Sequence, residues 1–370
     1  MGKCYLNIKA IFVIKILTIS MAFLFTSCHS GYLSIGYQVY PGAVWDNKHT
    51  KVAFIASKTA YRSAKGITRF PDGGIPRYLL SDVGLYVFDY EETLAKTKSR
   101  ISDEMLAEIV KRLESGRRVA VITGVNINFL HKYFGQYIPD GVRKKYHRNI
   151  IFMGELGTEV GRYDADGKLY LDEKNSAPLD SVTKQKIGAL VFDALNKNGL
   201  SAIPGVSTRF KKDADPAEYP TGESIETGLE KYGTAVVRFW DKSLRTRMKE
   251  LVEELSGPLA KLGLKVAASN SAIDISPMDK GEALEKLRAI ILKENGEAIM
   301  PASILVCGDS QNDYAMLAKS GVKGVYLGQL TKDELPKDVA ENVHISRIKG
   351  PEGMLSLFRS GSFHDLNESD

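Results

Sequence analysis

The chain has 370 residues, of which 44% are hydrophobic and 26% are charged. This composition is typical of globular proteins and excludes a disordered chain or a membrane protein with many spanning segments. Its 50 Lys and Arg residues against 45 Asp and Glu residues give a net charge of +5, and three of the positive charges, Lys3, Lys9 and Lys15, lie in residues 1–27. Because the remainder is nearly neutral, nucleic acid is not expected as a partner.

The first 28 residues have the pattern of an export signal. A lysine-containing stretch precedes a mostly apolar run at 16–25, and the sequence FTSC follows at 25–28. These four residues resemble a bacterial lipobox, which implies that 1–27 is a signal peptide and that Cys28 is lipidated in an exported, membrane-anchored lipoprotein. The alternative is an uncleaved anchor at 10–25, but its 16 residues fall short of the roughly 20 that a spanning helix needs.

Beyond the signal, residues 28–84 are predicted to be a tether and an N-terminal extension. From residue 85 the chain alternates between strand and helix patterns. Short apolar runs at 85–88, 119–122 and 150–153 predict buried parallel strands. A serine-capped amphipathic helix at 102–115 lies between the first two of them.

The segment 158–276 has a different pattern. Two strand-like runs at 158–163 and 168–173, joined by the turn sequence DADG at 164–167, predict a hairpin. Further elements are expected as helices at 180–198 and 242–256 and as strands at 236–240, 264–269 and 272–276. Gly257-Pro258 is expected to interrupt the helical pattern. The mixture predicts an antiparallel α+β domain inserted into a parallel one.

Strand and helix alternation resumes after the insert, with a helix at 281–294 and a strand at 304–307. We therefore predict an α/β fold with a Rossmann-like parallel sheet. Its core is built from 85–157 and 277–360, with the α+β cap at 158–276 and a tail at 361–370.

Polar residues follow the predicted strands, at the edge of a parallel sheet where ligands bind. Asp89 and Asp309 come after two different strands, and Asp313 lies one helical turn beyond Asp309. Carboxylates gathered at one edge repel each other unless a cation joins them, and their hard oxygens favour Mg²⁺. Thr123 can donate a hydrogen bond and Lys280 supplies a positive charge, which suits a phosphoryl group. Together these residues predict phosphoryl transfer to a carboxylate nucleophile.

The order of these residues resembles the haloacid-dehalogenase superfamily. The motifs are DYEET at 89–93, Thr123, Lys280 and GDSQND at 308–313, and the resemblance covers about residues 85–360. The insert is similar to the type-two cap of the sugar-phosphate phosphatases, including the sucrose-phosphate and trehalose-phosphate phosphatases. The resemblance implies a Mg²⁺-dependent phosphomonoester hydrolase acting on a sugar phosphate or a similar small phosphorylated metabolite.

The resemblance also implies a role for each acidic motif residue. Asp89 would attack phosphorus and form an aspartyl-phosphate. Its carboxylate, the backbone carbonyl of Glu91 and the carboxylate of Asp309 would hold Mg²⁺, and Asp313 would support the water shell of the ion.

The residues expected to contact substrate come from both domains. Thr123 and Lys280 would hold the phosphoryl oxygens. In the cap, Asn270 and Asp274 lie on strands that return toward Lys280, where related caps contact substrate. Both cap residues are therefore candidate substrate ligands.

Glu91 departs from the pattern of the resembled family, which places at this position an Asp that protonates the leaving alcohol and then activates water. Glu can do the same acid–base chemistry, but its extra methylene moves the carboxyl group, and a misplacement of about 1 Å can cost on the order of 100-fold in rate. Two functions therefore remain open: a phosphatase, or a surface-tethered binding or interaction protein on a catalytically weakened scaffold.

Overall fold

The structure is a computed structural model that describes residues 79–361, except for 81, 201, 205–224, 229–230, 240–242 and 270. The predicted signal peptide with Cys28, most of the extension, Asn270 and nearly all of the predicted tail lie outside the described residues. Among the helices of the described part, none is long and apolar enough to cross a membrane.

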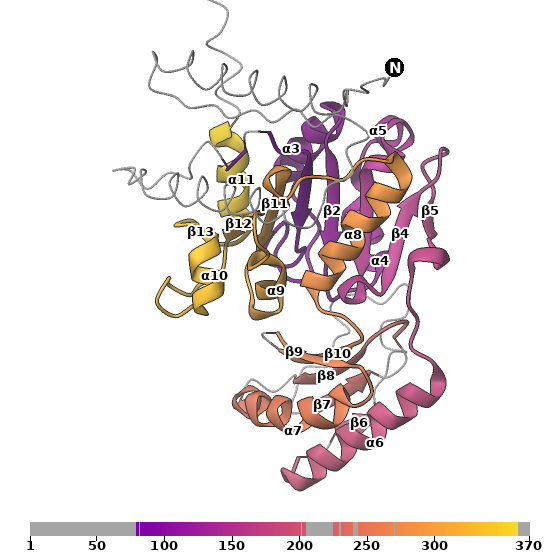
Figure 1. The fold of residues 1–370 in the computed structure, drawn as a ribbon, viewed down its shortest axis with the longest axis vertical. Coiled ribbons are helices and arrows are strands. Elements are labelled where there is room, and N and C mark those ends of the chain that lie inside the picture. The colour runs from indigo at the N-terminus through magenta and orange to yellow at the C-terminus, as the bar shows by residue number, and fades with distance from the viewer. Residues whose placement is uncertain are drawn as a thin grey trace, which may run out of the picture. The chain divides into compact units, whose positions relative to one another are not determined.

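The core is built on one large sheet. Its strands are β1 Leu85–Phe88, β2 Arg118–Ile122, β3 Ile150–Gly154, β4 Glu159–Tyr163, β5 Leu169–Leu171, β11 Ile304–Gly308, β12 Lys323–Tyr326 and β13 Val343–Ile345. They pair in the order β13-β12-β11-β1-β2-β3-β4-β5 (Figure 1). All pairs from β13 to β3 are parallel, and the pairs β3–β4 and β4–β5 are antiparallel.

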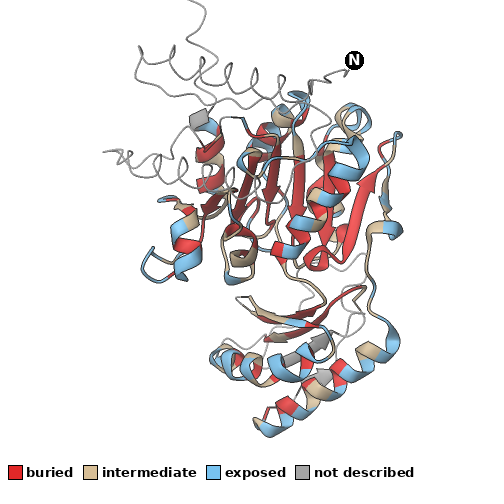
Figure 2. Cartoon of the chain, in the orientation of Figure 1, coloured by how far each residue is buried: buried red, intermediate tan, exposed pale blue. Residues whose placement is uncertain are grey.

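Helices cover both faces of this sheet. They are α3 Asp103–Glu114, α4 Ile127–Tyr133, α5 Asp140–Lys145, α8 Lys280–Asn295, α9 Tyr314–Leu317, α10 Lys337–Asn342 and α11 Gly350–Gly361. Successive strand side chains point to opposite faces, so Leu85 and Val87 pack with α8, α9 and α10. Tyr86 and Phe88 pack with α3, α4 and α11. Figure 2 shows the central strands as buried, which explains their continuous apolar runs and confirms the predicted α/β class.

The hairpin of β4 and β5 belongs to the core sheet, and our prediction that it is part of the cap is wrong. β4 pairs antiparallel with β3, and β5 pairs with β4. Without this hairpin, β3 would be an edge strand with a row of unpaired backbone groups. The hairpin satisfies that edge, although its sequence pattern does not reveal which sheet it joins.

The cap has its own sheet and helices. Its elements are α6 Ser181–Lys197, β6 Ala202–Pro204, β7 Ile225–Gly228, β8 Ala235–Phe239, α7 Met248–Ala260, β9 Lys265–Ala268 and β10 Ala272–Ser276. The strand order is β6-β7-β8-β10-β9, with only the β6–β7 pair parallel. Ile273 and Ile275 pack with α6 and α7 in a separate apolar cluster. The alternation of side chains therefore puts Asp274 on the opposite face of the cap sheet.

Helix α7 continues through Gly257-Pro258, which corrects the expected interruption at this dipeptide. A proline removes one backbone hydrogen bond and crowds the preceding turn. Pro258 lies two residues before the helix ends, so the lost bond falls in the last turns. Leu255 and Leu259 are buried on either side of it, and this packing outweighs the cost of the lost bond.

Candidate active site

Three strand ends that carry predicted site residues lie side by side. β1 pairs with β11 on one side and with β2 on the other. The backbone N–H of Asp89 donates to the carbonyl of Cys307 at 3.0 Å, which extends the β1–β11 pairing by one residue. Asp89, Thr123 and Asp309 therefore follow neighbouring strands at the same edge, as parallel topology requires.

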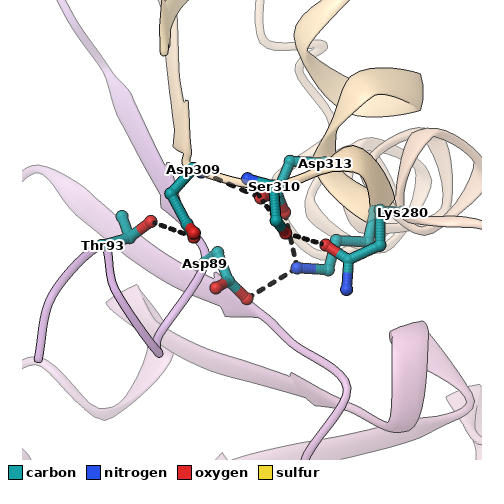
Figure 3. Close-up of polar contacts among 7 residues, drawn as sticks. Asp89, Thr93, Lys280, Asp309, Ser310 and Asp313 are labelled. Carbon is teal, nitrogen blue, oxygen red and sulfur yellow. Dashed lines mark hydrogen bonds and ion pairs between the residues drawn. The ribbon is translucent and has the colours of Figure 1, made fainter. Parts of the chain in front are cut away.

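Lys280 enters this edge from the first residue of α8. Asp279 caps the helix by accepting from the backbone N–H of Glu282, and Glu282 accepts in return from the N–H of Asp279. This capping box fixes where the helix begins. The Nζ of Lys280, a residue only 1% exposed, donates to Oδ1 of Asp89 and to Oδ1 of Asp313, both at 2.6 Å (Figure 3).

Asp313 organises the loop that carries Asp309. Its Oδ2 accepts from the backbone N–H of Asp309 at 3.0 Å, and from the N–H and hydroxyl of Ser310 at 2.9 and 3.1 Å. Asp313 is fully buried, and these donors together with Lys280 compensate its charge. Asp309 also accepts at Oδ1 from the hydroxyl of Thr93, at 3.3 Å. The carboxyl group of Asp309 is therefore held from the β1 side, and its backbone is held by its own loop (Figure 3).

The electrostatic state of the cluster follows from burial and from mutual repulsion. Burial raises the pKa of Asp89 to about 7, with Lys280 opposing this shift and Asp313 adding to it. Burial and the charges of Asp89 and Asp313 raise the pKa of Asp309 to about 8. Burial lowers the pKa of Lys280, but the charges of Asp313 and Asp89 outweigh it and the net shift is upward. Lys280 therefore stays protonated, and one ammonium faces three carboxyl groups.

The three carboxyl groups fit a divalent cation. Asp89, Asp309 and Asp313 each offer an oxygen, and these oxygens all lie within 4.8 Å of one another. Three carboxylates and one ammonium leave two negative charges uncompensated, and hard oxygen donors of this kind suit Mg²⁺. Burial is the main cause of the raised pKa values of Asp89 and Asp309, and the neighbouring carboxylates add to it. A bound cation would offset both effects by favouring the ionised carboxylates.

Glu91, the fourth predicted metal ligand, presents its side chain elsewhere. Its Oε1 accepts from the backbone N–H of Lys98 at 2.9 Å, within the turn that follows Asp89. The metal role predicted for Glu91 uses its backbone carbonyl, so this contact bears on the predicted acid–base role of the carboxyl group. In this arrangement the carboxyl group is held against its own turn.

Of the remaining predicted substrate ligands on described residues, Thr123 belongs to the core and Asp274 to the cap, and the two lie near the same loop. Thr123 is buried at the end of β2. Asp274, on the cap strand β10, is also buried, and the position that a Cβ would take on Gly124 is 3.8 Å from its Oδ2. Burial raises the pKa of Asp274, opposed by the positive charges of Lys231, Arg238 and Lys280. The cap therefore places a carboxyl group beside the loop that follows β2.

Our sequence analysis missed two residues that order the site, Thr93 and Ser310. Each lies inside a motif and donates to an aspartate of the cluster. For Ser310 the available signal was an acidic residue three positions away, a spacing that allows a side chain to close a loop through a hydrogen bond. Thr93 donates to Asp309 across 216 positions, so no local signal could have found it.

Part of the chain is similar to a family of known proteins. A sequence profile of the family described as sucrose-6F-phosphate phosphohydrolase matches residues 241–352. A curated relative, probable sucrose-phosphatase 3b of Arabidopsis thaliana, is 38% identical over 97 residues, which are 25% of this chain and 22% of that protein. The matched region therefore spans only about a fifth of the relative.

Solved structures extend the comparison to the fold. The IMP-nucleotidase of Plasmodium falciparum, with IMP bound, has a TM-score of 0.51 at 15% identity and covers 96% of this chain and 90% of that one. The sucrose-phosphatase of Synechocystis sp., in complex with sucrose and phosphate, has a TM-score of 0.46 at 15% identity and covers 75% and 97%. The likeness to the nucleotidase shows that this chain shares its fold. In such open parallel sheets ligands bind at the carboxyl ends of the strands, which is where the aspartate cluster lies.

Proposed function

We propose that the protein is a phosphatase that hydrolyses small phosphomonoesters through a covalent intermediate on Asp89. One observation carries the proposal. The buried carboxyl group of Asp89 stands at the strand-end edge and is held by Lys280, next to two further aspartates within cation-binding distance. A carboxylate that is positioned, desolvated and paired with a cation is an activated nucleophile.

The reaction takes two displacements at phosphorus. A carboxylate oxygen of Asp89 attacks the phosphoryl group, the bond to the substrate alcohol breaks, and the alcohol leaves with a proton from Glu91. Water then attacks phosphorus of the aspartyl-phosphate, gives its proton to Glu91, and releases orthophosphate and the free carboxylate. Lys280 and Thr123 stabilise the negative charge on the phosphoryl oxygens during both displacements.

Mg²⁺ bound by Asp89, Asp309 and Asp313 would supply Lewis-acid stabilisation of the charge on the transferring group. The chain's own residues prepare that site. Asp313 fixes the backbone of the loop through Asp309 and Ser310. Thr93 orients the carboxyl group of Asp309.

The proposed substrate is a sugar phosphate. The profile match at 241–352 covers about the last third of the cap and most of the second core segment, and the matched relative is a probable sucrose-phosphatase. Asp274 supports this class because it brings a hydrogen-bond acceptor for sugar hydroxyl groups to the face of the cap sheet that lies over the loop at Gly124. Asn270 is proposed to act with it.

Phosphate release from an aryl phosphate with Mg²⁺ tests the proposal. Asp89→Asn removes the nucleophile, so we expect activity to fall by about 1,000-fold or more. Asp193→Asn is the matched control, since Asp193 forms an exposed ion pair with Lys197 on α6 and its loss leaves turnover unchanged. Activity that survived in Asp89→Asn would overturn the assignment. A panel of sugar phosphates then ranks the substrates by kcat/KM.

The contact of Glu91 with Lys98 favours a second candidate, a binding protein on a scaffold with weakened turnover. Glu91→Asp distinguishes the two functions because it restores the shorter acid of the resembled family. A large gain in phosphate release from a nearly inactive parent supports the binding protein. A loss from an active parent supports the phosphatase.

We also propose that the protein is exported and anchored to a membrane by a lipid on Cys28. The proposal rests on the lysine-containing stretch, the apolar run and the FTSC sequence at 25–28. Metabolic labelling with a lipid precursor should mark the wild type and not Cys28→Ala. Equal labelling of the two would reject Cys28 as the site.

A further inference from the structure

The cap and the loop after β2 are joined by an unusual set of buried hydrogen bonds, which has a consequence for the proposed reaction. On the core side, the backbone N–H of Leu156 donates to the carbonyl of Thr123 and that of Glu155 donates to the carbonyl of Val125, both at 2.8 Å. Two consecutive residues can donate to one loop here because both have left-handed backbone angles, with φ of 47° at Glu155 and 59° at Leu156.

Such angles cost free energy in residues other than glycine and persist where the surrounding contacts hold them. Some of the contacts that hold this turn, at residues 155–157, come from the cap. The carboxylate of Glu155 accepts from the backbone N–H groups of Tyr232 at 3.3 Å, Gly233 at 2.9 Å and Thr234 at 3.2 Å, and from the hydroxyl of Thr234 at 3.2 Å. Glu155 is only 2% exposed, so these four donors replace the water that the carboxylate has lost.

The cap reaches the same loop directly through Lys231. Its Nζ donates to the carbonyl of Gly124 at 2.9 Å, so the carbonyls of Thr123, Gly124 and Val125 each have a donor. The carboxyl group of Asp274 lies beside Gly124 and is influenced by the charge of Lys231. Residues 231–234 are thus bonded to both sides of the junction, to the loop through Lys231 and to the turn through Glu155.

We propose that Glu155 and Lys231 are positioning residues that couple the orientation of the cap to the loop carrying Thr123. A cap that moves away must release the bond from Lys231 to Gly124 and uncover the carboxylate of Glu155, or must carry the loop with it. An oxyanion bound at Thr123 holds the loop in place. It therefore favours the seated cap, which is the state in which Lys231 and Glu155 keep their bonds between cap and core. Because coupling between two sites is reciprocal, the seated cap also favours the oxyanion. This inference rests on the proposed function, since it takes Thr123 as a phosphoryl ligand.

Binding of inorganic orthophosphate with Mg²⁺ to the full chain tests the coupling without requiring turnover. Calorimetry gives the affinity, and hydrogen exchange at the amides of Gly233 and Thr234 reports the seating of the cap. In the wild type we expect orthophosphate to slow exchange at these amides. In Lys231→Met we expect binding to weaken by about 10-fold, in the range typical of coupled sites, and the slowing to be lost. Lys231→Arg should restore both.

Lys184→Met is the matched control. Lys184 also donates to a backbone carbonyl, that of Lys231, at 2.6 Å, but this bond lies within the cap. It should leave both the affinity for orthophosphate and the slowing of exchange unchanged. A purely structural role of Lys231 predicts equal effects of the two variants, and that result would overturn the coupling.

Glu155→Gln extends the test to the other side of the junction. A lower kcat for an aryl phosphate at nearly unchanged KM supports a positioning role. A fall in kcat no larger than the fall in the folded fraction, measured by urea unfolding of variant and wild type, would contradict it. Lys231→Met with wild-type affinity and wild-type slowing overturns the coupling alone. A wild type that binds no orthophosphate in the presence of Mg²⁺ overturns the coupling together with the proposed function.

Discussion

In the core, the polar side chains of the candidate site follow the ends of strands, whereas in the cap they lie on the face of a sheet. Helices bury the core strands on both faces, so only the strand ends are free to carry Asp89, Thr123 and Asp309. In the cap, α6 and α7 pack on one face, and Asp274 lies on the other. A sheet covered by helices on both faces carries its polar site residues at the strand ends, whereas a sheet covered by helices on one face can carry them on the other face.

The two arrangements also differ in charge compensation. In the core the charges are paired directly, because the Nζ of Lys280 lies 2.6 Å from a carboxyl oxygen of Asp89 and 2.6 Å from one of Asp313. In the cap, the positive charges of Lys231, Arg238 and Lys280 act on the carboxyl group of Asp274. We therefore expect substitutions in the core to abolish turnover and substitutions on the cap face to change the affinity for substrate.

The largest expected effect is that of Lys280→Met. It removes the ammonium from two buried carboxylates, so phosphate release should fall by about 1,000-fold and the free energy of unfolding by about 3–5 kcal/mol. Lys286→Met is the control on the same helix, because Lys286 donates to the carbonyl of Gly157 and to no aspartate of the cluster. Kinetics and urea unfolding measure the two effects. Similar losses of activity in both variants would show that the loss comes from disturbed packing of α8 and not from the charge of Lys280.

Gly308→Ala should come next. A Cβ at this position would lie 2.5 Å from Cγ of Asp313, so the alanine must displace the side chain that orders the loop. A shift of about 1 Å at such a residue can cost on the order of 100-fold in kcat. Gly141→Ala, at a position with open space around the added methyl group, is the control. Normal turnover in Gly308→Ala would show that the core site tolerates displacement of Asp313.

On the cap face, Asp274→Asn should have a smaller effect that falls mainly on KM. The amide keeps an acceptor for a sugar hydroxyl but loses the charge, so we expect kcat/KM for a preferred sugar phosphate to fall by about 10-fold. For an aryl phosphate, which lacks the sugar, the change should be slight. Equal losses for both substrates would show that Asp274 acts on the phosphoryl group, as the core aspartates do, and not on the sugar.

The last expected effect is on stability and not on turnover, at Glu159 at the start of β4. Burial and the charge of Glu155 raise its pKa from 4.5 to about 7. A raised carboxyl pKa favours the folded state at low pH, and this contribution is lost as pH rises from 4.5 through 7. Glu159→Gln should therefore stabilise the fold at pH 8 by about 3 kcal/mol and flatten the dependence on pH below it. Glu253→Gln, on an exposed ion pair, should not.

The core was largely predictable from the sequence because its signals are local. Four-residue apolar runs and a capped amphipathic helix identify β1, α3, β2 and β3 within one or two residues. Once the strands are taken as parallel, the positions of Asp89 and Asp309 at one edge follow from topology. Short helices such as α4 and α10 were missed, since six or seven residues are too few for a helical pattern to emerge.

The sequence alone therefore determined the fold class and the aspartates expected at the strand ends, and it predicted an inserted cap whose first strands proved to belong to the core sheet. Tertiary structure decided which sheet takes the β4–β5 hairpin, where the carboxyl group of Glu91 rests, and how Glu155 and Lys231 join the cap to the core. Lys280 and Asp89 are 191 positions apart, and Glu155 meets Gly233 across 78. Periodicity and capping depend on near neighbours, whereas a buried carboxylate is compensated by whichever distant donors the packing brings to it.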